Sequence, residues 1–338
     1  MDSFTQIVLG ASVGEAILGK KIGRRAAIWG AIAGTIPDLD VFALKFLPYV
    51  DALMIHRGIT HSILFALITS IFLGFLVNSI YKKKFHTNFL DWFLLLFWGL
   101  FTHALLDCHT TWGTQLFWPL DYRVSLSSIF VVDPLYTVPF VLLLIIALFF
   151  QKDSSLRRRL NYLGIGISSL YLVFTLVIKQ TVFNKFEKNL NERQIAFEQI
   201  HIRPTPLNSF LWTANIETEN SFLIGNYSIF DSSFKPNYTT YPKKHFLINN
   251  YTDHSDLQKL LKILKGDFIV QHKGKDLLIS DLRFGQLYFG EESGPFVFNS
   301  LLEIKNNTII DIKEANSMRD KTRVQQSLQA LWSRIKGN

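Results

Sequence analysis

The sequence is poor in cysteine and in charge. Of its 338 residues one is cysteine, Cys108, and 18% are charged. A single cysteine excludes a disulfide framework, a cysteine-rich zinc site and a Cys-x-x-Cys redox motif. With 30 phenylalanines and no long low-complexity run, the chain is not a disordered, collagen-like or coiled-coil protein. Low charge combined with 49% hydrophobic residues is typical of a membrane protein.

Long uncharged segments in the first part of the chain predict membrane-spanning helices. The clearest is 59–81, which contains no Asp, Glu, Lys or Arg and, at ~1.5 Å per residue, can cross ~30 Å of hydrocarbon. Further spans are predicted at 92–106 (extended by Phe89 and Leu90), 135–150 and 160–178. Four such segments so close together favour membrane helices over the buried helices of a soluble core.

The N-terminal region holds two shorter Gly- and Ala-rich segments, 4–18 and 26–36, joined by the basic turn 20–25. No small-residue cleavage site follows a charged start, so we do not expect a removable signal peptide. Small residues let membrane helices approach one another closely. This region therefore predicts a tightly packed helical hairpin.

Basic residues cluster in three turns beside the apolar segments, at 20–25, 82–84 and 152–159. The positive-inside rule places these turns in the cytoplasm. Alternation through the spans then puts the following on the other side: the N-terminus, 37–56, 107–128 and everything after Lys179. Since topology accounts for the basic clusters, the net charge of +8 does not indicate nucleic-acid binding, and the expected partner is the lipid bilayer.

The character of the sequence changes near residue 180. Alternating apolar and polar residues between Gly, Asn and Pro turns predict β-strands at 208–230, 246–252, 267–281, 286–289 and 296–304. Helices are predicted at 255–264 and 320–335. We therefore expect an α-helical integral membrane bundle over 1–180, followed by a soluble, β-rich α+β domain over 181–338. The histidines of this second domain are scattered and form no recognisable catalytic motif.

Polar residues interrupt the helical part at three places, all on the same predicted side of the membrane. The first is Pro37-Asp38-Leu39-Asp40. Two acids separated by one residue in a turn can reach one cation, and proline ends the regular helix that would otherwise point them apart. Helix capping in a solvated loop is the alternative interpretation of this pattern.

The second place is the run 56–62, with the sequence His-Arg-Gly-Ile-Thr-His-Ser. His56 and His61, separated by a glycine-containing turn, can converge on one ion, and Arg57 can hold an anionic group such as phosphate. Thr60 is the predicted cap of the long helix that follows. The alternative is a pair of interfacial histidines beside an arginine whose head reaches the membrane surface.

The third place closes the second span. His103 and Asp107 are four residues apart, so they project from one face of a helix and can ligate one metal or form a His–carboxylate pair. Ionisable residues at the end of an apolar helix are functional-site candidates by default, although they can also simply end the span. Asp133, near the start of the third span, adds an acid on the same side. His109 is adjacent but points in another helical direction.

Together these clusters predict a metal site. The candidate ligands are Asp38, Asp40, His56, His61, His103 and Asp107, with Asp2 as a further acid in the same layer. Three histidines with carboxylates, and no usable thiolate, favour zinc, with manganese or iron as alternatives, over calcium or magnesium. Such ions activate water and polarise phosphoryl or carbonyl oxygens. The sequence has no P-loop, dinucleotide-binding or Gly-x-Ser-x-Gly motif.

At these residues the chain resembles the bacterial membrane-bound metal-dependent hydrolases of the YdjM-like inner-membrane family. The matching motifs lie in roughly the first 180 residues and are Met1-Asp2-x-x-Thr5, Pro37-Asp38-x-Asp40, His56-Arg57-Gly58-x-Thr60-His61-Ser62, His103-x-x-x-Asp107, Thr111-x-Gly113 and Asp133-Pro134. Family members often carry His after the N-terminal Thr, where this chain has Gln6. The resemblance implies a multi-pass hydrolase of the bacterial inner membrane whose substrate is poorly defined. The His-x-x-x-Asp pair is also similar to ligands of zinc-dependent phospholipase C and P1-type nucleases, an analogy that favours phosphoester chemistry.

We therefore expect a membrane-embedded metal-dependent hydrolase that uses metal-activated water on a phosphoester or related bond of a lipid-borne substrate. Arg57 is expected to neutralise substrate charge, and Asp133 to orient water or a histidine. One alternative is a metal-independent phosphatase in which a histidine paired with Asp107 attacks phosphate directly. The other is a non-enzymatic membrane regulator whose C-terminal domain binds a partner. Also open are the substrate, the number of metals, the oligomeric state and whether the site includes Asp2, Gln6 or His109.

Overall fold

The structure is a computed structural model that describes residues 1–291, 294–315 and 320–337. The chain divides into two compact units. The first, here named the helical unit, comprises Met1–Lys45, Ile55–Val177 and Pro206–Ser209. The second, here named the sheet unit, comprises Phe46–Met54, Ile178–Thr205 and Phe210–Asn338. Residues 46–54, which lie in the N-terminal part of the sequence, therefore belong to the sheet unit. Residues 206–209, which lie in the C-terminal part, belong to the helical unit.

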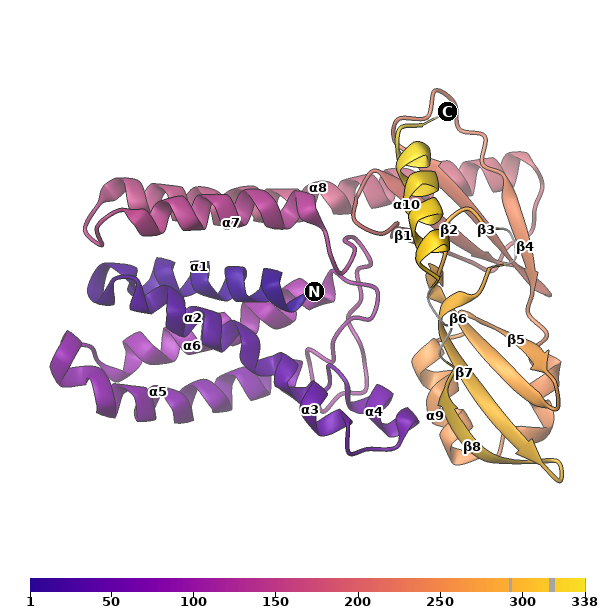
Figure 1. Ribbon diagram of the computed structural model, residues 1–338, viewed down its shortest axis with the longest axis horizontal. Coiled ribbons are helices and arrows are strands. Elements are labelled where there is room, and N and C mark those ends of the chain that lie inside the picture. Colours follow the sequence, from indigo (N-terminus) through magenta and orange to yellow (C-terminus); the bar gives the residue numbers. More distant parts are fainter. Residues whose placement is uncertain (292–293, 316–319, 338) are drawn as a thin grey trace. The chain divides into compact units, whose positions relative to one another are not determined.

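Long helices build the helical unit. They are α1 (Ser3–Ile22), α2 (Arg25–Thr35), α5 (Ile63–Phe85), α6 (Phe89–Cys108), α7 (Pro134–Phe149) and the N-terminal part of α8 (Ser155–Glu192). Between α2 and α5 lie the short elements η1 (Ile36–Leu39), α3 (Asp40–Leu44) and η2 (Ile59–His61). The α1–α2, α5–α6 and α7–α8 turns lie at one end of this unit, and η1, η2 and the C-terminal end of α6 lie at the other (Figure 1).

Within the described residues, the helical stretches long and apolar enough to cross a membrane are Arg25–Leu44, Ile63–Phe85, Phe89–Cys108 and Ser155–Glu192. Helix α8 thus continues well beyond the span predicted at 160–178. Helix α7 is apolar but has 16 residues, which extend only ~24 Å. Large apolar side chains such as Phe72, Ile80 and Leu170 are exposed, as expected of surfaces that lipid tails cover. The predicted fold class, an α-helical integral membrane bundle followed by a soluble α+β domain, is confirmed.

Small residues set the spacing between α1 and α2. Gly10 and Gly14 on α1 face Gly30 and Gly34 on α2. A Cβ added at Gly30 would lie 2.1 Å from the Gly10 carbonyl oxygen and 2.8 Å from the Gly14 Cα. Membrane helices approach this closely only where side chains are absent from the contact. The predicted tight hairpin is therefore confirmed, and it fixes the position of the Gly34 carbonyl at the end of α2.

Two antiparallel four-stranded sheets form the sheet unit. The first has the order β1 (Gln199–Pro204), β2 (Leu211–Glu217), β3 (Ser221–Ser228), β4 (Tyr238–Pro242), and the second the order β5 (Phe268–Lys273), β6 (Asp276–Gln286), β7 (Phe296–Lys305), β8 (Thr308–Glu314). The helical elements of this unit are α4 (Tyr49–Ile55), the C-terminal part of α8, η3 (His245–Tyr251), α9 (Ser255–Leu264) and α10 (Lys321–Ile335). Helix α9 covers the second sheet (Figure 1), and its Leu257, Leu260 and Leu264 are buried in one core with Phe268 and Val270 of β5.

Sequence-based predictions for this unit are confirmed in some places and wrong in others. Helix α9 has the predicted bounds, and α10 starts one residue later than predicted. The strand predicted at 246–252 is wrong, because this stretch forms the 3₁₀-helix η3, with Ile248 buried and Phe246 exposed. The strand predicted at 286–289 is wrong as well, since β6 ends at Gln286. Strands β1, β4 and β8 are absent from the sequence-based prediction.

Adding a methyl group at the α1–α2 contact should destabilise the helical unit. We expect Gly30→Ala to lower the free energy of unfolding by about 1–3 kcal/mol, because the new Cβ cannot be placed without moving the α1 backbone. Gly166→Ala is the matched control, since nothing lies within 4 Å of a Cβ at that position on α8. Thermal unfolding of the full chain in detergent measures both effects. Equal midpoints for the two variants would contradict this description of the packing.

Candidate metal centre

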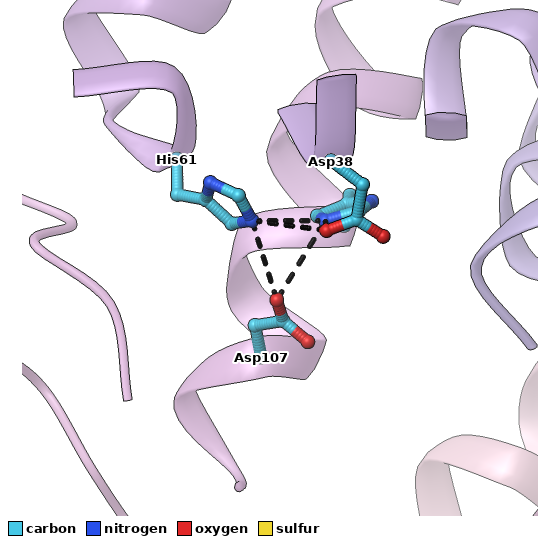
Figure 2. A group of neighbouring side chains, drawn as sticks. Asp38, His61 and Asp107 are labelled. Carbon is cyan, nitrogen blue, oxygen red and sulfur yellow. Dashed lines mark hydrogen bonds and ion pairs between the residues drawn. The ribbon is translucent and has the colours of Figure 1, made fainter. Parts of the chain in front are cut away.

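Four side chains of the helical unit converge at the end opposite to the basic turns. Asp38 comes from η1, His61 from η2, and His103 and Asp107 from the end of α6. Each offers one ligand atom, and the four atoms lie within 4.8 Å of one another. Figure 2 shows Asp38, His61 and Asp107 pointing toward a common centre. These residues are referred to below as the four-residue group.

The distances within the four-residue group match those around a tetrahedral metal ion. His61 Nε2 and His103 Nε2 are 3.2 Å apart. Asp38 Oδ1 lies 3.5 Å from His61 Nε2 and 3.4 Å from His103 Nε2. Asp107 Oδ2 lies 3.4 Å and 3.6 Å from the same two nitrogens. Ligand atoms placed about 2.1 Å from a tetrahedral ion such as zinc are about 3.4 Å from one another, so these five separations are compatible with ligands of one metal ion.

The group is buried. His61, His103 and Asp107 are fully buried, whereas the Asp38 side chain is 16% exposed. Asp107 Oδ2 is buried, and Arg57 Nε forms an ion pair with it at 3.0 Å. Burying carboxylates is costly, and a cation at the centre of the group would compensate their charge further. Two imidazole nitrogens and two carboxylate oxygens form a donor set that zinc, manganese and iron accept.

Contacts at the far side of each imidazole turn its Nε2 toward the centre. His103 Nδ1 lies 2.6 Å from the Gly34 carbonyl oxygen. Because a carbonyl oxygen can only accept, Nδ1 carries the proton and Nε2 is left to bind a cation. His61 Nδ1 lies 3.0 Å from the Thr60 hydroxyl. The prediction that Thr60 caps the following helix is wrong, since Ser62 caps α5.

The carboxylates favour positive charge at the centre of the group. Burial alone would lower the pKa of His61, but its hydrogen bonds with Asp107 and Asp38 outweigh burial and raise the pKa above its ordinary value. The carboxylates therefore stabilise a proton or a metal ion at the nitrogen that faces the other ligands. A metal ion would replace that proton, since metal binding to imidazole releases protons.

Polar groups from three segments hold Asp107 in place. Its Oδ1 accepts hydrogen bonds from the Gln6 side-chain amide at 3.0 Å and from the amino group of Met1. Arg57 Nε lies 3.0 Å from Asp107 Oδ2, and the same guanidinium donates to Thr110 Oγ1 at 2.8 Å. Arg57 thus contacts a candidate ligand, and its neutralisation of substrate charge stays a prediction. Gln6, at the position where family members often carry His, contacts the group through Asp107.

Asp40 and His56 form a neighbouring pair outside the four-residue group. Asp40 Oδ2 lies 3.4 Å from His56 Nδ1 and accepts the Arg57 backbone N–H at 3.0 Å. Asp38 and Asp40 point in different directions because η1 runs directly into α3, and helical residues two apart project about 200° from one another. The proline therefore does not end the helical backbone as predicted. The structure thus brings together four of the six predicted ligands.

Asp133 lies at the start of α7, where it acts as the helix cap. Its carboxylate accepts the Leu135 N–H at 2.9 Å, and the hydroxyls of Tyr171 and Ser209 each donate to it at 2.9 Å. Burial raises its pKa despite these hydrogen bonds. These contacts join α7, α8 and the 206–209 stretch of the helical unit, and the predicted catalytic role of Asp133 stays a prediction.

Sequence reasoning left the role of Gln6 open and did not predict the other groups that orient the ligands. The Gly34 carbonyl carries no sequence signal, because every residue has one. Gln6 does carry a signal, since a buried amide on the apolar helix α1 requires a hydrogen-bond partner. Two other candidates have contacts of their own. Asp2 caps α1, and His109 Nδ1 lies 2.9 Å from Ser128 Oγ in surroundings whose burial lowers the pKa of His109.

These features define a class of protein: a multi-pass helical membrane protein with a buried aspartate–histidine group at one end of its bundle. Residues 1–182, more than half of the chain, match the model of a family described as YdjM inner membrane protein. The chain therefore belongs to the YdjM inner membrane protein family, which confirms the resemblance found in the sequence motifs. All members of the four-residue group lie within the matched region.

Two relatives share parts of the sequence. The inner membrane protein YbcI of Escherichia coli (strain K12) is 32% identical over 106 residues, which are 31% of this chain and 59% of the relative. The uncharacterized protein YfhP of Bacillus subtilis (strain 168) is 26% identical over 239 residues, which are 67% of this chain and 68% of the relative. The match to YbcI thus spans less than two thirds of that protein's length. No solved structure matches the chain.

Metal content should distinguish the four-residue group from the neighbouring pair. We expect the full chain, purified without added metal, to carry about one divalent cation per molecule, and the double variant His61→Ala, His103→Ala to lose it. The double variant Asp40→Asn, His56→Asn is the matched control and should retain the metal. Inductively coupled plasma mass spectrometry measures the number of metal ions per protein molecule. Equal metal content in the two variants, or loss from the control alone, would refute the assignment of ligands.

Proposed function

We propose that this protein is a membrane-embedded, metal-dependent hydrolase that acts on a phosphoester or related bond of a lipid-borne substrate. The observation that carries the proposal is the convergence of two imidazole nitrogens and two carboxylate oxygens, at separations of 3.2–3.6 Å, inside a membrane protein. Ionisable side chains in such surroundings are costly and mark functional sites. Since the site lies at one end of membrane-spanning helices, a substrate held in the bilayer is the kind that reaches it most directly.

The donor set fits zinc first, with manganese or iron as alternatives. The Nε2 atoms of His61 and His103 and the carboxylates of Asp38 and Asp107 would hold the ion. When bound, such an ion lowers the pKa of a water molecule and polarises a phosphoryl or carbonyl oxygen. Asp38 is the partly exposed member of the group, so water and substrate would approach from its side, and a bound water would join the four residues as a further ligand or take the place of that carboxylate.

The surrounding residues keep this geometry fixed. The Gly34 carbonyl, itself held by the α1–α2 contact, orients His103, and Arg57 with Gln6 orients Asp107. Full burial of the other ligands excludes bulk water from three sides of the group. A preorganised, water-poor site makes charge stabilisation by fixed groups more effective than the same groups would be in water.

The geometry favours this proposal over direct attack by a histidine. A nucleophilic histidine needs one ring nitrogen oriented by a partner and the other facing the phosphate. Here His103 Nε2 faces His61 Nε2 at 3.2 Å, and both side chains are fully buried. Two imidazole nitrogens that face one another at this distance can share a cation, and neither faces an approaching substrate.

We also place the four-residue group and the C-terminal domain on the extracytoplasmic side of the bacterial inner membrane. The support is the charge distribution of the helical unit. The basic turns 20–25, 82–84 and 152–159 lie at the end opposite to the group (Figure 1), and basic turns face the cytoplasm in inner-membrane proteins.

Activity on lipid phosphoesters tests the hydrolase proposal. The full chain in detergent or nanodiscs is assayed for phosphate release from a panel of phosphorylated lipids. A chelator should abolish release, and added zinc, manganese or iron should restore it. We expect His61→Ala and Asp107→Asn each to lower kcat/KM by about 100-fold or more, because each removes a ligand. His86→Asn, which removes a histidine from the basic end of the unit, is the control and should leave activity unchanged.

The other outcomes separate the alternatives. Activity that persists in the chelator, in protein shown by elemental analysis to contain no metal, would instead support the metal-independent histidine phosphatase. An unchanged cellular phenotype after replacement of His56, His61 and His103, together with no activity on any lipid in the panel, would support the non-enzymatic regulator.

A further inference from the structure

A chemically different feature lies at the basic end of the helical unit. A cavity of about 470 Å³ opens between the α1–α2 turn and the α7–α8 turn. Gly23, in the first turn, has a φ of 66°, and the Lys152 Cβ of the second turn lies 3.9 Å from the position of a Cβ at Gly23. The two turns, more than 100 residues apart in the sequence, thus form the walls of one cavity.

The lining of this cavity is cationic. Arg24, Arg25, Lys152 and Arg157 line it, and none of the described lining residues is acidic. Glu15 neutralises Arg157 through a bidentate ion pair, with Nε–Oε1 and Nη2–Oε2 distances of 2.6 and 2.7 Å. Among the described residues no carboxylate forms an ion pair with the other three cations. The cavity therefore carries an uncompensated positive charge.

Contacts with uncharged groups hold two of these cations at the cavity. Arg24 Nε donates to the Leu148 carbonyl oxygen at 2.7 Å. The Arg25 guanidinium lies 5.2 Å above the centre of the Phe85 ring. A carbonyl or an aromatic ring orients a guanidinium without cancelling its charge. The cations are thus positioned for an anionic partner that the helical unit does not itself supply.

The remaining wall of the cavity is apolar. Ile28, Phe149 and Phe150 line it and are exposed, Phe149 to 76%. Cations and exposed apolar side chains in one cavity, at the end of membrane helices, match a ligand with an anionic head and apolar chains. Basic pockets between membrane helices bind the phosphates of anionic lipids in this manner.

We propose that this cavity binds the headgroup phosphate of an anionic phospholipid, with Arg24, Arg25 and Lys152 contacting the phosphate and the phenylalanines contacting the acyl chains. This proposal is independent of the hydrolase proposal, since it uses other residues at the other end of the unit. Topology alone explains why basic residues occur in the turns. It does not explain why two separate turns place them around one cavity without an acid.

Lipid binding by the full chain tests the proposal. The protein in detergent is incubated with phosphatidylglycerol or phosphatidylcholine of identical acyl chains, and native mass spectrometry counts the bound lipids. We expect the double variant Arg24→Gln, Lys152→Gln to weaken phosphatidylglycerol binding by about tenfold or more, with phosphatidylcholine unaffected. The double variant Lys82→Gln, Lys83→Gln is the matched control, because it removes the same charge from the C-terminal end of α5, outside the cavity.

Selective loss in the cavity variant supports the proposal. An equal loss in the control, or equal retention of the two lipids by the unaltered chain, overturns it, because binding then reflects overall charge alone. Millimolar inorganic phosphate should not displace phosphatidylglycerol, because only the lipid also contacts the phenylalanines. If phosphate displaces it while chloride at equal ionic strength does not, the cations alone hold the ligand, the cavity is a site for soluble phosphate and the lipid proposal fails. If the double variant does not fold, the single variant Lys152→Gln is compared with Lys82→Gln in the same binding measurement.

Discussion

At the end of α6 two imidazole nitrogens lie 3.2 Å apart, between two carboxylates and out of contact with water on most sides. Groups of this kind cannot remain buried without positive charge among them, because uncompensated carboxylates in an interior are strongly destabilising. Arg57 and the amino group of Met1 supply positive charge, and both contact Asp107. The four ligand atoms lie close enough together to hold a metal ion between them.

The architecture of the helical unit follows from the need to hold these atoms. The glycines of α1 and α2 bring the two backbones into contact, which places the Gly34 carbonyl where it accepts from His103. The i, i+4 spacing on α6 puts His103 and Asp107 on one helical face. The short elements η1 and η2 then present Asp38 and His61 from the side. Helix packing that involves no ligand directly thus determines the orientation of the ligands.

The sequence predicted the parts of this arrangement that depend on local pattern. Uncharged runs located the spanning helices α5, α6 and α8, and small residues predicted the α1–α2 hairpin. Amphipathic spacing gave α9 its bounds, because Leu257, Leu260 and Leu264 recur on one face. Alternation misled at 246–252, where a 3₁₀-helix buries one residue of the run. Local alternation cannot distinguish a short strand from such a turn when long-range pairing decides.

The site was predictable as a set of candidates but not as a geometry. Motifs at 37–40, 56–62 and 103–107 bring chemically suitable side chains to the same end of the bundle. Which of them meet depends on the backbone between them: the helical continuation of η1 into α3 separates Asp38 from Asp40, and the turn before η2 separates His56 from His61. These directions are set by tertiary packing, and a backbone carbonyl such as that of Gly34 leaves no trace in the residue pattern.

Crystals of the full chain purified without added metal would test the central claim most directly, by anomalous scattering measured on both sides of the zinc, iron and manganese absorption edges. The account predicts one strong peak about 2.0–2.2 Å from the Nε2 atoms of His61 and His103 and from carboxylate oxygens of Asp38 and Asp107. Well-ordered density for these side chains with no anomalous peak among them, or with the peak at Asp40 and His56 instead, would contradict it.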